Sequence, residues 1–280
     1  MEYLAPTLLE DAYRALAFDD ARCLAGGQSL VAMMNLGLVA PARLVSLRRI
    51  AALRGITATS EGGLRIGAMT THAEIAALSA QGTEAAPGDA LAAGPALLAQ
   101  AASVIAYPAI RAWGTIGGSV AHADPAADYP VALVAAEAAI EVGSAAGSRR
   151  IAARDFFRGV FESALAAGEI VIAIHVPAGP TGARAKYEKL SVVAGDFAIL
   201  SVAAIVARTA QIAIGGCGPV PLFASGLETA DDALLAAGRR LAAASDPPDD
   251  HRTSPAYRRR VLPELLRRAV RAARAEREIR

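Results

Sequence analysis

The sequence of 280 residues predicts an α+β fold. Helical and strand patterns follow one another along the chain without the regular alternation that a doubly wound parallel sheet requires. A segment rich in proline and glycine, at residues 177–182, then separates a long first part from a shorter last part. We therefore expect one domain at 1–176, with subdomains at about 1–55 and 56–176, and a second domain at 177–280.

Composition and charge narrow the classes of function. Hydrophobic residues make up 54% of the chain and charged residues 20%, which is typical of a soluble globular protein. The formal net charge is +1, so we expect neither a nucleic-acid-binding protein nor one held to an anionic membrane. There is no signal-peptide pattern and no apolar run long enough to span a bilayer. The expected location is the cytoplasm, where Cys23 and Cys217 would stay reduced.

The first stretch is predicted to alternate helix and strand around a glycine pair. Thr7 is a candidate N-cap for a helix at residues 8–17. The other predicted elements, in chain order, are a strand at 21–25, a turn at Gly26 and Gly27, a helix at 30–36 ended by Gly37, and a strand at 43–47.

The second stretch is predicted to contain a capped helix and a long loop. Thr71 and Glu74 match a capping box, the pairing that opens many helices. The other predicted elements are a strand at 64–68, a helix at 96–106, a loop rich in glycine and aspartate at 113–130, and a strand at 169–174.

The third stretch is predicted to contain two strands, at 199–207 and 210–215, followed by at least two helices. In the arginine-rich end at 257–280, apolar residues recur at helical spacing, and the other faces carry arginines. The apolar residues are Val261, Leu265, Ala269 and Ala273, and the arginines are Arg258, Arg259, Arg267, Arg268, Arg271 and Arg274. This pattern fits a solvated helix or a docking surface for a partner subunit.

The first candidate site is the segment 24–30, between a predicted strand and a predicted helix. Gly26 and Gly27 have no Cβ atoms, so successive backbone N–H groups can point at one anion. Ser29 is a candidate N-cap for the following helix, whose dipole also favours negative charge. A phosphate or pyrophosphate would suit this loop, although a tight strand-to-helix turn would use the same residues.

The second candidate site is the segment 113–130, with its own glycine pair, Gly117 and Gly118. Asp124 and Asp128 could accept hydrogen bonds from ribose hydroxyls, but an Asp-Pro turn and helix cap would use them equally well. The further side chains able to hydrogen-bond a ligand are those of Thr115, Ser119 and His122. Two glycine-pair loops in one chain favour an extended ligand that carries phosphate.

Several common sites lack their sequence signatures. Neither a Rossmann G-x-G-x-x-G nor a Walker-type phosphate loop occurs. No constellation of nucleophile and base is present, and the histidines lack metal-ligand spacing, so we expect no catalytic residue and no metal site.

Taken together, the motifs resemble the FAD-binding (medium) subunits of molybdenum hydroxylases. These belong to the xanthine dehydrogenase family, and the sequence is most similar to the medium subunits of aerobic carbon monoxide dehydrogenases. The resemblance covers nearly the whole chain in order. The motifs that carry it are residues 25–30, 66–71, 115–119, 124–128, 187–190, 195–197, 214–216 and 256–259.

The resemblance implies a two-subdomain FAD-binding domain of the PCMH type, followed by a smaller α+β domain. It places both glycine loops on the FAD diphosphate, with His122 and Asp128 along the ribityl and isoalloxazine side. Lys189 and Phe197 would come from the second domain, with the Phe197 ring covering the flavin. The residues assigned to FAD are Ala25, Gly26, Gly27, Gln28, Ser29, Leu30, Thr115, Ile116, Gly117, Gly118, Ser119, His122, Asp124, Asp128, Lys189 and Phe197.

The function that the resemblance implies is electron relay. A large partner subunit would oxidise the substrate at molybdenum, a small [2Fe-2S] subunit would pass the electrons on, and this chain would deliver them to quinone, NAD or another acceptor. Carbon monoxide, an aldehyde or an N-heterocycle would each fit as the substrate. The alternatives are a stand-alone FAD-dependent oxidoreductase of the same fold, which needs a proton donor, and a scaffold that has lost FAD.

Two departures from the family pattern concern the flavin. Ser119 stands where the family usually has asparagine, and Val192 and Val193 replace a pair that is commonly basic. The second change bears on the electron acceptor, because the resemblance places those two positions facing it.

Overall fold

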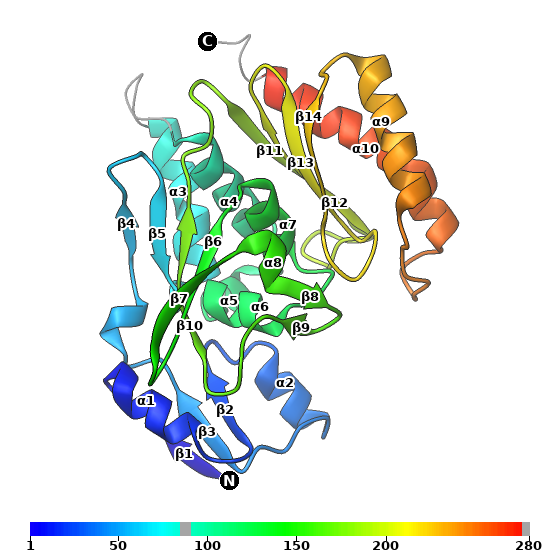
Figure 1. Ribbon diagram of the computed structural model, residues 1–280. Coiled ribbons are helices and arrows are strands. Elements are labelled where there is room, and N and C mark those ends of the chain that lie inside the picture. Colours follow the sequence, from blue (N-terminus) through cyan, green and yellow to red (C-terminus); the bar gives the residue numbers. More distant parts are fainter. Residues whose placement is uncertain (85–90, 276–280) are drawn as a thin grey trace.

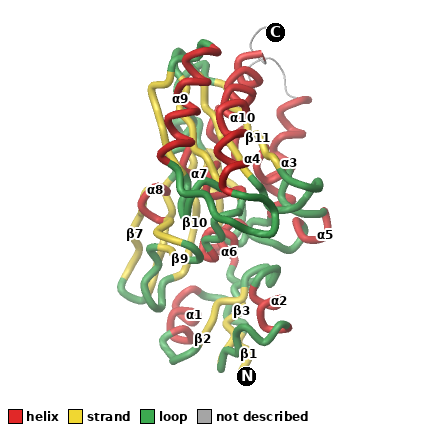
Figure 2. Tube along the Cα trace, turned by 90° about the vertical axis from the view of Figure 1, so that its right-hand side faces the viewer, coloured by secondary structure: helices red, strands yellow, loops and turns green. Residues whose placement is uncertain are grey.

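The computed structural model describes residues 1–84 and 91–275 and confirms the α+β fold. A small lobe, a central sheet with its helices and a C-terminal sheet with two helices follow one another along the long axis (Figure 1). The small lobe carries the N-terminus at one end of the molecule, and the last helix ends at the other (Figures 1 and 2).

The small lobe is a three-stranded parallel sheet with two short helices. Its strands β1 (Glu2–Leu4), β3 (Arg43–Ser46) and β2 (Ala21–Leu24) lie in the order β1-β3-β2. Helix α1 (Leu9–Leu16) buries its alanines, and its N-cap is Leu8, so the prediction of Thr7 is wrong by one residue. Helix α2 (Leu30–Asn35) follows the first glycine loop and has no buried residue.

The central sheet has five strands and brings distant parts of the chain together. Its order is β4 (Ile56–Ala58), β5 (Leu64–Gly67), β10 (Ile170–Val176), β6 (Ala139–Ser144) and β7 (Gly147–Ala152). Strand β10 is the last in sequence, yet it pairs antiparallel with both β5 and β6. All residues of β10 except His175 are apolar, which suits this central position, because both faces of the strand are covered.

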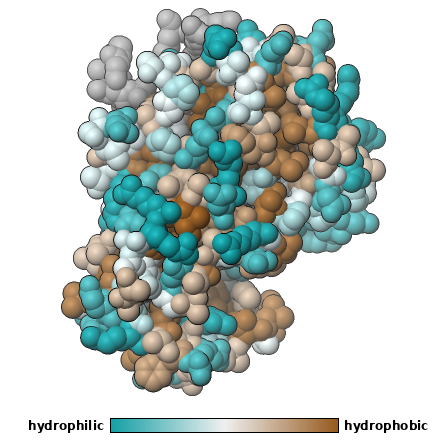
Figure 3. All heavy atoms as spheres, in the orientation of Figure 1, coloured by the Kyte–Doolittle hydropathy of each residue, from teal (hydrophilic) through white to brown (hydrophobic). Residues whose placement is uncertain are grey.

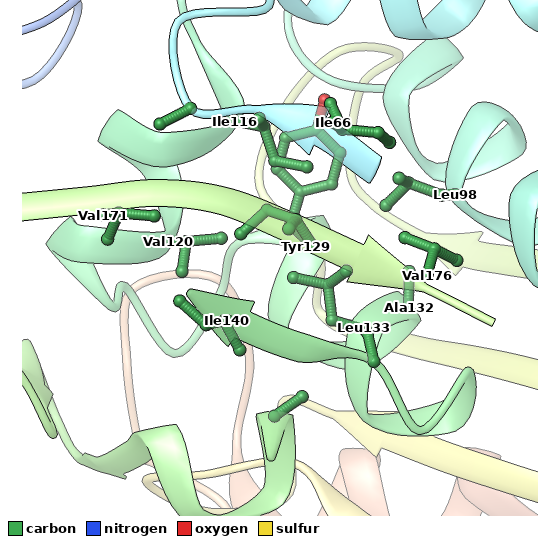
Figure 4. Close-up of a cluster of buried hydrophobic side chains, with 14 of the residues drawn as sticks. Ile66, Leu98, Ile116, Val120, Tyr129, Ala132, Leu133, Ile140, Val171 and Val176 are labelled. Carbon is green, nitrogen blue, oxygen red and sulfur yellow. The ribbon is translucent and has the colours of Figure 1, made fainter. Parts of the chain in front are cut away.

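A long cluster of buried side chains holds the central part together. Helix α7 (Asp128–Ala135) is buried at every position, so it lies inside this core. Figure 4 shows Tyr129, Leu133 and Ile116 lying with side chains of the central strands and of α4 (Ala93–Ser103).

The C-terminal part is an antiparallel meander with helices on one face. Its strands are β11 (Arg184–Leu190), β12 (Leu200–Val206), β13 (Ala210–Gly215) and β14 (Leu222–Leu227), so the structure adds β11 and β14 to the two predicted strands. Helices α9 (Asp231–Ala244) and α10 (Pro255–Ala275) cover one face, and α4 and α7 contact the other.

Two further predictions are wrong. The segment 113–130 is not a continuous loop, because it contains α6 (Ile116–His122) and the start of α7. Arg258 does not lie on a solvated face. It is 1% exposed and binds both carboxylate oxygens of Asp250, because α10 turns it toward the sheet. The last five residues of the predicted terminal helix lie outside the described residues.

The remaining elements are one longer helix, α3 (His72–Glu84), and several short elements. The short ones are η1 (Ala51–Leu53), α5 (Pro108–Arg111), α8 (Ala153–Phe156), β8 (Phe157–Gly159) and β9 (Glu162–Ser163). Over residues 1–84 and 91–275, no helix has both the length and the apolar character that a membrane crossing would need.

Candidate functional site

The two glycine loops contact each other where the small lobe meets the central part. A Cβ atom built on Gly26 would lie 2.1 Å from the carbonyl oxygen of Trp113 and 2.8 Å from the Cα of Gly114. A Cβ on Gly118 would lie 3.3 Å from the Cβ of Ala25. Residues separated by about ninety positions therefore form one surface, and Gly26 lets the two backbones touch.

The backbone N–H groups of the first loop are not used in hydrogen bonds among the described residues. None of the N–H groups of residues 26–30 donates to another residue that the structure describes. Gly27 adopts a left-handed conformation, with φ of +74°, as turns that gather successive N–H groups often require. Because peptide N–H groups are obligatory donors, this loop is suited to an acceptor from outside the chain.

The side chains of the first loop only partly follow the predictions. Gln28 donates from Nε2 to the carbonyl oxygen of Gly26 at 3.1 Å, which holds the loop closed on itself. Ser29 occupies the N-cap position of α2, but its side chain makes no capping hydrogen bond, so that prediction is wrong. Helix α2 begins at Leu30 and has only six residues, so its dipole adds little.

The second loop satisfies its own backbone groups. The N–H of Ile116 donates to Thr70 at 3.0 Å, and that of Gly117 donates to Ala68 at 2.8 Å. The N–H of Gly118 donates to the Oγ1 of Thr115, which makes Thr115 the N-cap of α6. The N–H of Ser119 donates to the carbonyl oxygen of Thr115 at 3.0 Å. The second loop is therefore held in place by its own hydrogen bonds, and its N–H groups at residues 116–119 are already used within the chain.

A buried histidine that the sequence analysis did not identify supports the second loop. His72 opens α3, and its N–H donates to the carbonyl oxygen of Gly114 at 3.0 Å. Its Nδ1 lies 3.0 Å from the hydroxyl of Tyr129. Burial, followed by the nearby Arg111, lowers the pKa of His72 to about 4, so the ring is neutral at physiological pH. The capping box, which the structure confirms, placed this helix start, but no sequence signal indicated that His72 is buried.

His122 is the last residue of α6, and Asp124 lies just beyond the helix. The His122 ring packs on Phe161 with ring centroids 4.9 Å apart. Asp124 accepts a hydrogen bond from the N–H of Ala126 at 2.8 Å, so one carboxylate oxygen already serves the turn that the sequence left open as an alternative.

Asp128 and Lys189 bind each other. Lys189 donates from Nζ to Asp128 at 2.9 Å, and the Tyr187 hydroxyl donates to the same carboxylate at 2.8 Å. Burial raises the pKa of Asp128, and the Lys189 ammonium and the hydrogen bonds from Lys189 and Tyr187 oppose that shift. The structure therefore brings these two predicted site residues together as an internal ion pair between α7 and β11.

Phe197 lies in the connection between β11 and β12. Its ring is 44% exposed, and the guanidinium of Arg252 lies 5.5 Å from the ring centroid. Val192 and Val193, in the same connection, are 66% and 58% exposed, so the departure from a basic pair leaves an apolar surface.

A second apolar surface lies on the small lobe. Leu36 and Leu38, at the end of α2, are 74% and 67% exposed, and Val31 is 41% exposed. Figure 3 shows apolar atoms on the small lobe where α2 lies. An extended apolar surface of this kind is typical of a place where a ligand or another protein binds.

The site therefore fits a dinucleotide with a diphosphate. The five successive N–H groups of residues 26–30 match the acceptor oxygens of such a group, and the second loop forms a wall of small residues beside them.

The comparisons with known proteins agree with this fit. Residues 1–179 match the family described as "FAD binding domain in molybdopterin dehydrogenase". Residues 185–273 match "CO dehydrogenase flavoprotein C-terminal domain".

Individual relatives match over nearly the full length. The carbon monoxide dehydrogenase medium chain of Afipia carboxidovorans is 36% identical over 98% of this chain and 96% of its own length. The glyceraldehyde dehydrogenase medium chain of Sulfolobus acidocaldarius is 34% identical over 95% of this chain and 96% of its own. A chain of a Cu,Mo-CO dehydrogenase structure superposes with a TM-score of 0.89 at 34% identity, covering 98% of both chains.

Both parts of the chain thus match the same kind of protein, and both glycine loops lie within the part that matches the FAD-binding family. The chain belongs to the FAD-binding medium subunits of molybdopterin dehydrogenases, which are subunits of oxidoreductases in the carbon monoxide and xanthine dehydrogenase family.

Proposed function

We propose that this chain relays electrons from the iron–sulfur clusters of a partner subunit to an external acceptor such as a quinone or NAD. Two kinds of partner follow from this role: a large subunit with the molybdenum cofactor and a small [2Fe-2S] subunit. The names of the relatives support an assembly of several subunits, because they are medium chains or medium subunits.

One observation carries the proposal. The loop 26–30 presents five successive backbone N–H groups without an acceptor among the described residues, directly against a second loop whose groups are satisfied. Charge-assisted hydrogen bonds of this kind contribute roughly 1.5–3 kcal/mol each, so two or three of them would hold a diphosphate firmly.

Within this site we propose different roles for the predicted residues. The loop 26–30 donates to the diphosphate, and Ala25 supports it from the end of β2. Thr115 and Ile116 fix the second loop, since both are buried. Ligand contacts there come from Gly117, Gly118 and Ser119, and farther along from His122, Asp124 and Phe197.

FAD, when bound, supplies the one- and two-electron chemistry. The chain itself holds the diphosphate, excludes water and orients the ring system. The two proposed domains, at 1–176 and 177–280, divide this work, because the glycine loops belong to the first and Phe197 to the second.

The test uses the native complex purified through a tag on this chain, with Gly118→Val as the variant. A Cβ atom on Gly118 would already lie 3.1 Å from the Oγ1 of Thr115, so the larger side chain must occupy the surface between the loops. We expect a folded chain without FAD. The complex should still let substrate reduce the iron–sulfur clusters, and it should lose transfer to the external acceptor.

The matched control is Gly218→Ala, since a Cβ atom on Gly218 would meet nothing nearer than 3.9 Å. That variant should keep its FAD and its activity. Normal FAD content in Gly118→Val would contradict the placement of the diphosphate. A wild-type complex without molybdenum and iron would contradict the relay.

A further inference from the structure

The two glycine loops carry no charge of their own. Residues 24–30 and 113–121 contain neither an acidic nor a basic side chain. The diphosphate proposed to bind there is an anion, and arginine is the side chain whose planar fork of donors matches phosphate oxygens. A cation beside the loops would therefore add a charged contact to the backbone N–H groups of residues 26–30.

Arg48 lies at the edge of the small lobe from which the first loop starts. Strands β2 and β3 are parallel neighbours, so their carboxyl ends meet at the same edge of the sheet. The N–H of Leu47 donates to the carbonyl oxygen of Leu24 at 3.0 Å, which continues the pairing beyond both strands, and Arg48 follows directly. Arg54 donates from Nη2 to the carbonyl oxygen of Arg48 at 2.7 Å and fixes its backbone. Ligands of open α/β sheets commonly bind beyond the carboxyl ends of parallel strands, which is where Arg48 lies.

The ring of Trp113 holds the Arg48 guanidinium beside the contact between the two loops. The guanidinium carbon lies 4.2 Å from the ring centroid. The carbonyl oxygen of the same tryptophan is the atom that a Cβ atom on Gly26 would meet at 2.1 Å. Trp113 is 51% exposed, so its ring is not needed to fill the core. The guanidinium is therefore one tryptophan side chain away from the place where the loops touch.

The charge of Arg48 is available to a ligand. Arg43, on β3, also stacks on an aromatic ring, that of Phe18, but its guanidinium pairs with Glu2 at 2.6 Å. Arg48 is exposed, and within residues 1–84 and 91–275 its side chain makes neither an ion pair nor a hydrogen bond. A guanidinium that lies flat on a ring keeps the N–H groups at its edge free for phosphate. Exposed contacts of this kind add little to stability, so a ligand accounts for the arrangement better than folding does.

We propose that Arg48, held in place by the ring of Trp113, is a specificity-determining residue that binds the FAD diphosphate through its guanidinium. This inference rests on the proposed function, because it assumes that the diphosphate lies on the loop 26–30. It adds one charged side chain, from the connection that follows β3, to a site otherwise made of backbone donors and small residues.

The experiment measures the dissociation constant for FAD of the full chain after removal of its FAD. Two salt concentrations are compared, about 0.01 M and about 1 M, between which the screening length falls from about 30 Å to about 3 Å. Arg48→Gln should weaken binding about 10-fold at low salt. Its difference from the wild type should shrink at high salt, because salt screens a charged contact. The thermal unfolding midpoint of the FAD-free chain should change little, since Arg48 is exposed.

Variants of Trp113 test whether the ring holds the guanidinium. Trp113→Leu should weaken FAD binding about 3-fold, because the guanidinium loses its support. Trp113→Phe keeps an aromatic face and should recover most of that loss. Arg48→Gln combined with Trp113→Leu should bind FAD about as weakly as Arg48→Gln alone, since both changes remove the same contact.

The matched control is Arg49→Gln. Arg49 is the next residue along the chain, is exposed like Arg48, and stacks on no aromatic ring of the described residues. The control removes the same amount of charge and should leave FAD affinity unchanged. An equal loss in the control would replace the specific contact by a general positive field around the small lobe.

The outcomes separate the two proposals. Unchanged affinity in Arg48→Gln, or a loss that does not depend on salt, would exclude a charged contact with the diphosphate. Additive losses in the combined variant would show that Trp113 contacts FAD independently of Arg48. Each of these results, like an equal loss in the control, overturns the inference while the flavin site stands. A wild-type chain that binds no FAD overturns both.

Discussion

The two glycine loops touch each other, yet their backbone groups are satisfied in opposite ways. In the loop 26–30, the N–H groups have no acceptor among the described residues, whereas every N–H from Ile116 to Ser119 donates within the chain. The surroundings explain the difference. The first loop lies at the edge of a small lobe, and the second is built onto the buried start of α6 and the connection before α3. Paired glycines alone therefore do not identify the loop that binds an anion.

The largest expected effect comes from separating the two loops. Gly26→Val places a branched side chain where even a Cβ atom would lie 2.1 Å from the Trp113 carbonyl oxygen. We expect complete loss of bound FAD, measured by visible absorbance of the purified chain, together with a lower unfolding midpoint. Retention of FAD would show that the loops need not touch to bind it.

The next effect is a pH dependence that belongs to the second loop. Because burial lowers the pKa of His72 from 6.5 to about 4, protonation favours the unfolded state. The free energy of unfolding should thus rise by about 3 kcal/mol from this residue between pH 4 and pH 7 and stay level above that. Denaturant unfolding at several pH values measures this dependence. In His72→Gln, the free energy of unfolding should rise less steeply between pH 4 and pH 7 than in the wild-type protein. Equal slopes in the two proteins would contradict the buried, neutral ring.

A smaller loss of stability should follow from crowding the second loop at its base. A Cβ atom on Gly117 would lie 2.5 Å from the Cβ of Ala68. Gly117→Ala should lower the free energy of unfolding by about 1–3 kcal/mol, as overpacking does elsewhere. Denaturant titration measures this, and Gly218→Ala is the control without a clash. An unchanged midpoint in Gly117→Ala would mean that the loop is not rigidly packed.

The smallest effect concerns the cap of α6. Thr115→Ala removes the oxygen that accepts from the Gly118 N–H at 3.2 Å. We expect a loss of about 1 kcal/mol in unfolding free energy. FAD affinity should fall only slightly, because the first loop keeps its donors. A large loss of FAD with unchanged stability would instead assign the Thr115 hydroxyl directly to the ligand.

Local patterns were enough to predict much of the fold. The strand predicted at 169–174 and the capping box at Thr71 and Glu74 both correspond to elements of the structure. The segment 113–130 could not be predicted in the same way, because glycine and aspartate in sequence favour a loop. The tertiary contacts of Ile116 and Val120 make part of it a buried helix.

The candidate site shows the same limit. The glycine pairs and the family resemblance suggested which residues to consider, and the structure brings the two loops into contact. The sequence did not reveal that Asp128 and Lys189 bind each other, or that His72 supports Gly114, because these contacts join residues far apart in the chain. Arg258 was predicted to lie in solvent because the spacing of apolar residues in α10 gives no information about a carboxylate partner outside the helix.

Amide hydrogen exchange with and without FAD tests the contrast between the two loops most directly. The N–H groups of Ile116 to Ser119 should exchange slowly in both states, because the chain already satisfies them. Those of residues 26–30 should exchange rapidly without FAD and become strongly protected when it binds. Protection gained at 116–119 with none at 26–30 would contradict the account, because the diphosphate would then be held by the other loop.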